Sequence, residues 1–141
     1  MELFRSFQIS GSALTAEKVR IDTVAGNLAN LQTTRTAAGG PYRRKTVVFA
    51  EKLNKVRSVP PAFRGYGVRV ASVVEDPNPP RLEFDPEHPD ANEEGFVAYP
   101  NIDMAKEMTD LITASRSYEA NTTAVNTAKS IYLKALEIGR G

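Results

Sequence analysis

SRSYEANTTAVNTAKSIY, residues 115–132, is the stretch that decides the fold we expect for this chain. It lies within a heptad repeat whose first seam position is apolar or aromatic throughout: Met104, Leu111, Tyr118, Val125 and Tyr132. The second seam position is half polar and holds Met108, Ser115, Thr122, Lys129 and Leu136. A seven-residue repeat of this kind is typical of a helix that packs along another helix. The sequence therefore predicts one long helix over residues 102–138.

The ends and the length of this helix are also predicted. Asn101 or Asp103 can cap its N-terminus, and Gly139 marks its end. The helix would be ~55 Å long, whereas a compact chain of this size has a radius of gyration of only ~14 Å. It must therefore project from any compact body, and it needs a partner helix. The alternative is a break into two shorter helices near residues 122–126.

A second heptad repeat covers about residues 5–31. Its apolar positions are Phe7, Leu14, Ile21, Val24, Leu28 and Leu31, and Ser10 and Glu17 interrupt it. The two repeats predict an antiparallel coiled coil whose remaining positions contact neighbouring subunits. Asparagine is a mediocre helix former, so the presence of Asn27, Asn30 and Asn121 in or near the seams needs a reason. We expect buried amides that fix register and partner choice; the alternative is that they face solvent or cap helix ends.

Short strands separated by turns are predicted between the helices. The strand signals lie at residues 46–50, 68–75, 81–84 and 96–99. We expect an extended, mainly α-helical chain with a small β and loop insertion. Its parts are an N-terminal helix in residues 1–34, a loop-rich β insertion with a proline-rich connector in 35–100, and a C-terminal helix in 101–141.

Charge is distributed unevenly along the middle of the chain. Residues 35–72 hold nine Lys or Arg against one acid, and residues 75–107 hold ten acids against two cations. The two halves therefore carry +8 and −8. They could pair within one fold, or they could form complementary patches on successive subunits of an assembly.

The acidic stretch DPEHPDANEEG, residues 85–95, contains the only histidine of the chain. Carboxylates and an imidazole could bind a divalent cation or cleave a glycosidic bond, but no calcium-loop spacing and no HExxH motif is present. Proline restricts the residue before it to extended conformations. We therefore expect a stiff connector into the C-terminal helix rather than a catalytic or metal site, formed by Asp85, Pro86, His88, Pro89, Asp90 and Gly95.

Composition excludes several classes of function. The absence of cysteine rules out disulfides and thiolate metal sites, and a net charge of +1 gives no overall attraction to nucleic acid. No apolar run approaches the ~20 residues that span a bilayer. Residues 1–25 lack the features of a cleaved secretory signal. If the protein leaves the cytoplasm, we expect a route that cleaves no signal peptide.

Three motifs carry a resemblance to a known family. AGNLAN with Thr33 and Thr34 resembles the ANNLAN-x-x-T signature of the rod and hook family of bacterial flagellar axial proteins, and SRSYEAN at residues 115–121 is similar to its SRxYxAN segment. Residues 85–108, DPEHPDANEEGFVAYPNIDMAKEM, resemble the DPxHPDAxxxGYVxxPNVxxxxEM stretch of a proximal rod subunit in that family. These matches are collinear and reach both ends of the chain.

The resemblance implies a structural subunit of the proximal rod of the flagellar basal body, and not an enzyme. It implies export through the flagellar type III apparatus, and assembly in the periplasm with other copies, with neighbouring rod proteins and with the adaptor subunit between membrane ring and export gate. Terminal helices that are disordered in the monomer would pack into an inner tube. We expect no cofactor, nucleic acid or small-molecule substrate. The alternative is a small cell-wall-acting hydrolase that uses residues 85–94.

Overall fold

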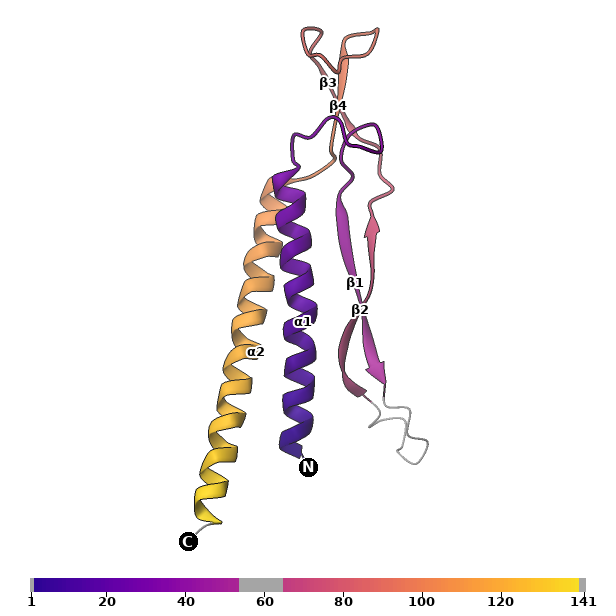
Figure 1. Cartoon of the computed structure of the whole chain (residues 1–141). Helices are drawn as coiled ribbons and strands as arrows, with labels where there is room; N and C mark the ends of the chain where they lie inside the picture. The colour runs from indigo at the N-terminus through magenta and orange to yellow at the C-terminus, as the bar shows by residue number, and fades with distance from the viewer. Residues whose placement is uncertain (1, 54–64, 140–141) are drawn as a thin grey trace.

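The computed structural model describes residues 2–53 and 65–139, and their elements form an elongated body. The elements are α1 (Glu2–Ala29), β1 (Lys45–Leu53), β2 (Gly65–Glu75), β3 (Arg81–Phe84), β4 (Phe96–Tyr99) and α2 (Met104–Ile138). Helices α1 and α2 run antiparallel side by side, and the β1–β2 hairpin lies along the other side of α1 (Figure 1). The β3–β4 hairpin stands beyond one end of the helix pair. Within the described residues, no helix is both long and apolar enough to cross a membrane.

Helix α2 is continuous, as the heptad repeat predicts. Asp103 caps it, because its Oδ1 accepts hydrogen bonds from the amides of Ala105 at 2.9 Å and Lys106 at 3.3 Å. At the other end, the amide of Gly139 donates to the carbonyl of Ala135 at 3.1 Å. The alternative of a break near residues 122–126 is wrong, since the helix runs through them and the hydroxyls of the two threonines there bond carbonyls of the preceding turn.

The expectation of a mainly α-helical chain is not quite right. Two helices pack together as expected, but β1 and β2, of 9 and 11 residues, form an antiparallel hairpin that lies alongside α1. The predicted strands at 46–50 and 68–75 are thus parts of longer strands. The strands predicted at 81–84 and 96–99 are confirmed as β3 and β4. The fold is therefore two helices with two small antiparallel sheets.

The β1–β2 hairpin lies very close to α1 at Ser12, where a hydrogen bond joins the two. Ser12 Oγ accepts a hydrogen bond from the amide of Val68 at 3.0 Å and donates one to the carbonyl of Ile9 at 2.7 Å. Gly67 lies beside it with φ +119°, and a Cβ atom there would collide with Ser12 Oγ. A side chain at this position would therefore meet both backbone strain and a collision.

Candidate functional site

The candidate site is a polar junction where α1, the start of β1 and the first turn of α2 meet, formed by Asn27, Tyr42, Arg44 and Glu107. Asn27 and Glu107 are both fully buried. Asn27 Nδ2 donates to Glu107 Oε2 at 2.9 Å and to the carbonyl of Lys45 at 2.8 Å. Its Oδ1 accepts from the amide of Lys45 at 2.9 Å and from Tyr42 Oη at 3.2 Å. The amide of Asn27 therefore uses all four of its hydrogen-bonding positions.

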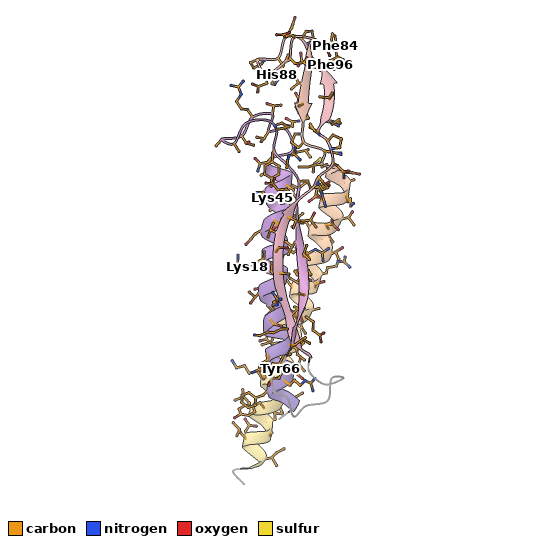
Figure 2. The ribbon with its side chains drawn as sticks, turned by 90° about the vertical axis from the view of Figure 1, so that its right-hand side faces the viewer. Lys18, Lys45, Tyr66, Phe84, His88 and Phe96 are labelled. Carbon is orange, nitrogen blue, oxygen red and sulfur yellow. The ribbon has the colours of Figure 1, made fainter. Side chains whose placement is uncertain are left out.

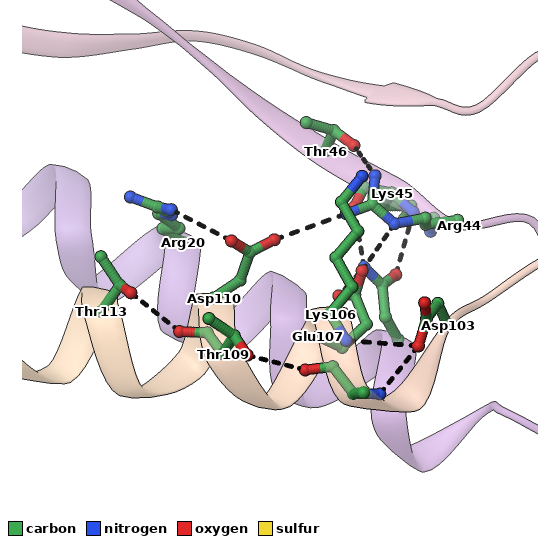
Figure 3. Close-up of polar contacts among 12 residues, drawn as sticks. Arg20, Arg44, Lys45, Thr46, Asp103, Lys106, Glu107, Thr109, Asp110 and Thr113 are labelled. Carbon is green, nitrogen blue, oxygen red and sulfur yellow. Dashed lines mark hydrogen bonds and ion pairs between the residues drawn. The ribbon is translucent and has the colours of Figure 1, made fainter.

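Arg44 neutralises the buried carboxylate of Glu107 (Figure 3). Its Nε donates to Glu107 Oε1 at 2.6 Å, and its Nη1 donates to Thr46 Oγ1 at 2.8 Å. A buried carboxylate is tolerated when it is paired and hydrogen-bonded on both oxygens. Arg44 supplies the charge, and Asn27 supplies the hydrogen bond to the second oxygen.

Asp110 lies one turn further along α2, between two arginines (Figure 3). Arg20 Nη2 of α1 and Arg44 Nη2 each stand 3.7 Å from its carboxylate. These pairs are longer and more exposed than the pair with Glu107, so their contribution to stability is small. A hollow of about 220 Å³ beside them is lined in part by these three side chains.

Burial raises the pKa of the Tyr42 phenol, and the nearby carboxylates of Glu75 and Glu107 raise it further. Tyr42 therefore stays neutral and keeps donating to Asn27 at physiological pH. Because the polar groups of the junction bond to one another, it fixes the positions of two helices and a hairpin rather than binding a ligand.

The structure places the sequence-predicted seam residues at three levels of burial. Val24 and Asn27 are buried. Those that are partly buried are Phe7, Leu14, Ile21, Leu28, Asn30, Leu31, Leu111, Asn121 and Val125. Those that are exposed are Met104, Met108, Tyr118, Tyr132 and Leu136.

The second seam of α2 is displaced by one residue from its predicted position. Its buried residues are Glu107, Ala114 and Ala128, with Asn121 partly buried between them at the same spacing. In the predicted series Ser115 is half-buried, and Met108, Thr122, Lys129 and Leu136 are exposed. Small and polar side chains occupy the contact, which allows the helices to approach closely.

Only one of the three seam asparagines bonds across elements. Asn30 donates to the carbonyl of Gly26 at 2.9 Å and accepts from Thr33 Oγ1 at 3.1 Å, so it closes the end of α1. Asn121 donates to the carbonyl of Ser117, within α2. Asn27 therefore joins α1 to other elements, and its role in register and partner choice stays a prediction.

The 85–95 stretch is the loop that joins β3 to β4, and it does not lead into α2 as the connector prediction requires. His88 Nδ1 accepts from the amide of Asp90, and its ring lies against Tyr99. The carboxylate of Asp90 accepts from Thr34 Oγ1 at 2.8 Å and pairs with Arg35 at 2.5 Å. Among the described residues, no group of acidic or histidine side chains could hold a metal ion.

The structure also bears on Gly95 and on the uneven charge of the middle of the chain. Gly95 has φ +80°, and a Cβ atom there would stand 2.9 Å from the ring of Phe84, so the loop requires glycine. The pairs Arg35–Asp90 and Arg44–Glu107 join the basic and acidic halves within one chain. Lys55, Arg57 and Arg64 of the basic half lie outside the described residues.

Sequence reasoning missed Tyr42, Arg44 and Glu107 as parts of the junction. Glu107 lies within the quoted 85–108 motif, but nothing in its type or spacing indicates burial. The sequence did hold a signal for Arg44. A buried amide in a helix seam needs polar partners, and the basic run nearest to Asn27 along the chain begins at Arg43.

Comparison with known proteins identifies the family. Residues 7–35 match the family described as flagella basal body rod protein, and residues 93–138 match the one described as flagellar basal body rod FlgEFG protein C-terminal. The flagellar basal-body rod protein FlgC of Borreliella burgdorferi is 42% identical over 100% of both chains. The chain belongs to the FlgC family. FlgC of Bacillus subtilis is 45% identical, and FlgC of Escherichia coli O157:H7 is 44% identical, each over 99% of this chain and 100% of the relative.

Membership of the FlgC family decides between the two functional hypotheses. The family consists of structural rod proteins and is non-enzymatic. The chain is therefore a structural protein of the flagellar basal body, and the hydrolase hypothesis for residues 85–94 is dropped. The junction around Asn27 joins the two segments that match the rod families, since Asn27 lies in one and Glu107 in the other.

Proposed function

We propose that this FlgC chain is a subunit of the proximal rod, where it polymerises through α1 and α2 to form part of the drive shaft and of the wall of the export channel. Residues 1–34 and 101–141 would form the inner layer as an antiparallel coiled coil. Residues 35–100 would form the outer layer. Other copies and neighbouring rod proteins would be the lateral partners.

The observation that carries this proposal is the uncovered apolar face of α2. Met104, Met108 and Ile112 follow one another at four-residue intervals and are each about half exposed, although α1 already covers a neighbouring face of the helix. Contiguous exposed apolar surface of this kind marks interaction sites. In the assembled rod, helices of adjacent subunits would cover it.

The polar junction supports a role in the transmission of torque. Torque passes through a rod only if the inner and outer parts of each subunit turn together. Asn27 and Glu107 tie both helices to the hairpin through buried, charge-assisted hydrogen bonds, which resist displacement more than exposed ion pairs do.

The remaining expectations concern location and delivery. We place the subunit in the periplasmic part of the basal body, next to the adaptor subunit between membrane ring and export gate. It would arrive unfolded through the flagellar type III apparatus. The long, thin body with few buried side chains supports this proposal, because little structure must be undone before export.

Met108→Glu tests the proposed function in a flagellated bacterium that depends on this gene. The new charge lies on the exposed side of α2, so the chain folds, but rods do not form and motility is lost. Thr109→Glu is the matched control, because Thr109 is also exposed and lies outside the apolar series. Normal motility and basal bodies with Met108→Glu would refute polymerisation through this face.

A further inference from the structure

His88 lies in the loop between β3 and β4, beside the hairpin at one end of the molecule (Figure 2). It is the only histidine of the chain, and its side chain is half-buried. Its Nδ1 accepts a hydrogen bond from the backbone amide of Asp90 at 3.0 Å. A ring nitrogen of imidazole accepts a hydrogen bond only while it carries no proton. This contact therefore requires the neutral form of His88.

The same loop repeats this contact with side chains that do not have this requirement. Asp85 Oδ1 accepts from the backbone amide two residues later at 3.3 Å, and Asn92 Oδ1 does so at 3.0 Å. A bond from the side chain to the amide two residues on is the arrangement of an Asx turn. His88 and Asp90 have the same spacing, so the imidazole takes the place of an Asx oxygen. Of these three acceptors, His88 is the one that becomes a donor on protonation.

The residue that His88 holds also ties the hairpin to the segment that follows α1. Asp90 Oδ2 accepts from Thr34 Oγ1 at 2.8 Å, and Asp90 Oδ1 pairs with Arg35 at 2.5 Å. We call these two contacts the Asp90 tie. Strands β3 and β4 pack mainly on each other, and a hollow of about 220 Å³ beside the tie is lined in part by Thr34 and Asp90. The position of the hairpin therefore depends in part on this tie.

Several titratable and charged groups lie on the elements around His88. The ring of Tyr99 on β4 stands edge to face with the imidazole, at 6.3 Å between centroids. The full set is Asp85, Glu87, Asp90, Glu93 and Glu94 of its own loop, Tyr99 and its register partner Arg81 of the hairpin, and Arg35 after α1. Histidine is the side chain type that ordinarily changes charge between pH 5 and 8. A change of pH within this range therefore acts on the loop through its imidazole.

We propose that His88 is a pH-dependent latch, whose neutral ring holds the amide of Asp90 and keeps the Asp90 tie closed, and whose protonation opens it. On protonation Nδ1 gains a hydrogen that points at the N–H of Asp90, and two donors cannot share one bond. The charged ring is also attracted to the acids of the loop, in competition with Arg35. The hairpin is thus held firmly at neutral pH and loosely in mild acid. This inference concerns the single chain and does not depend on the proposed function.

Nuclear magnetic resonance of the full chain, labelled with ¹⁵N and ¹³C, tests the latch at pH 7.5 and pH 5.5. The first measurement is the protection of the Asp90 amide from hydrogen exchange, corrected for the intrinsic rate at each pH. It should fall by about two- to tenfold at pH 5.5, the range that one hydrogen bond contributes. The second is the nuclear Overhauser effect between Thr34 and Asp90, which should weaken. The amide of Glu94, bonded to Asn92, should keep its protection.

His88→Asn is the matched variant, because Asn92 makes the same turn in this loop and asparagine does not titrate. Its Asp90 amide should be equally protected at both pH values. His88→Ala has no acceptor, so its Asp90 amide should be poorly protected at both.

Three outcomes would overturn the latch. The first is equal protection of Asp90 at both pH values in the unmodified chain. The second is a loss of the same size in His88→Asn, which would assign the change to a carboxylate. The third is loss of protection with an unchanged Overhauser effect between Thr34 and Asp90, which would show that the tie stays closed.

Discussion

The carboxylate of Glu107 and the side-chain amide of Asn27 are joined by a 2.9 Å hydrogen bond between residues 80 positions apart, and neither side chain is exposed to solvent. Through this bond the first turn of α2 is tied to the last turns of α1. The backbone of Lys45, the first residue of β1, and the side chain of the preceding Arg44 complete the arrangement. The relative positions of both helices and the hairpin therefore depend on a few buried polar groups.

Removal of the buried carboxylate should destabilise the chain strongly. Glu107→Ala leaves Arg44 Nε and one Asn27 N–H without a partner, and breaking a buried pair costs about 3–5 kcal/mol of unfolding free energy. Urea denaturation followed by circular dichroism measures the change. Glu119→Ala, on the exposed side of α2, should change the free energy by less than about 0.5 kcal/mol. Equal effects of the two variants would contradict a structural role for the junction.

Asn27→Asp should destabilise the chain in a way that depends on pH. The substitution replaces a donor to Glu107 with a second carboxylate, and two adjacent carboxylates raise the pKa of one of them. Since that folded-state pKa lies above its unfolded value, the loss of stability should be larger at pH 8 than at pH 5. Unfolding curves at both pH values check this. A loss of stability that is the same at pH 5 and pH 8 would mean that the donor to Glu107 is unimportant.

Tyr42 should titrate above the ordinary phenol value of 10.0, because burial and nearby carboxylates disfavour its anion. Its folded-state pKa lies above the unfolded one, so stability from Tyr42 is present below pH 10 and is lost as pH rises through the folded-state pKa. Absorbance of the phenolate, compared between the unmodified chain and Tyr42→Phe, isolates this titration. Ionisation of Tyr42 at or below its ordinary value would exclude the buried hydrogen bond to Asn27.

Gly67→Ala should loosen the β1–β2 hairpin from α1. The new Cβ would collide with Ser12 Oγ, and φ +119° adds backbone strain of about 1–3 kcal/mol. Gly39→Ala is the matched control, since Gly39 also has a positive φ but no atom stands within 4 Å of a Cβ there. Hydrogen exchange at the Val68 amide should rise with Gly67→Ala and remain unchanged with Gly39→Ala. Unchanged protection of Val68 in both variants would show that the contact with Ser12 is not close.

The heptad repeats predicted both helices, because the apolar residues of a packed helix recur at regular intervals in the sequence. The same repeats misplaced the second seam of α2 by one residue, since its buried positions hold Glu107, Ala114 and Ala128 rather than large apolar side chains. The hydrophobic pattern assigned Met108 to the seam because it is apolar, but Met108 is exposed. The face that we propose to be covered by a neighbouring subunit is apolar like a core, so the pattern alone does not distinguish the two.

The buried partners of Asn27 could not be predicted from the sequence. Its need for partners was visible, because an asparagine in a helix seam requires hydrogen bonds. Lys45 lies beside Asn27 because residues 30–44 fold back toward α1, and Glu107 lies there because α2 packs antiparallel to α1. Both are long-range features of the fold. The 85–95 loop shows the same limit, since its prolines predicted a stiff connector but could not reveal that β3 and β4 pair across it.

The central claim is that α1 and α2 stay tied at Asn27 and Glu107 while the outer face of α2 is covered by neighbouring subunits. A cryo-electron microscopy map of isolated basal bodies, with this chain traced, tests both parts at once. We predict that the side chains of Met104, Met108 and Ile112 are buried against an adjacent subunit and that the Asn27–Glu107 hydrogen bond is retained. A map in which these three side chains face solvent, or in which α1 and α2 of one chain are separated, would contradict the account.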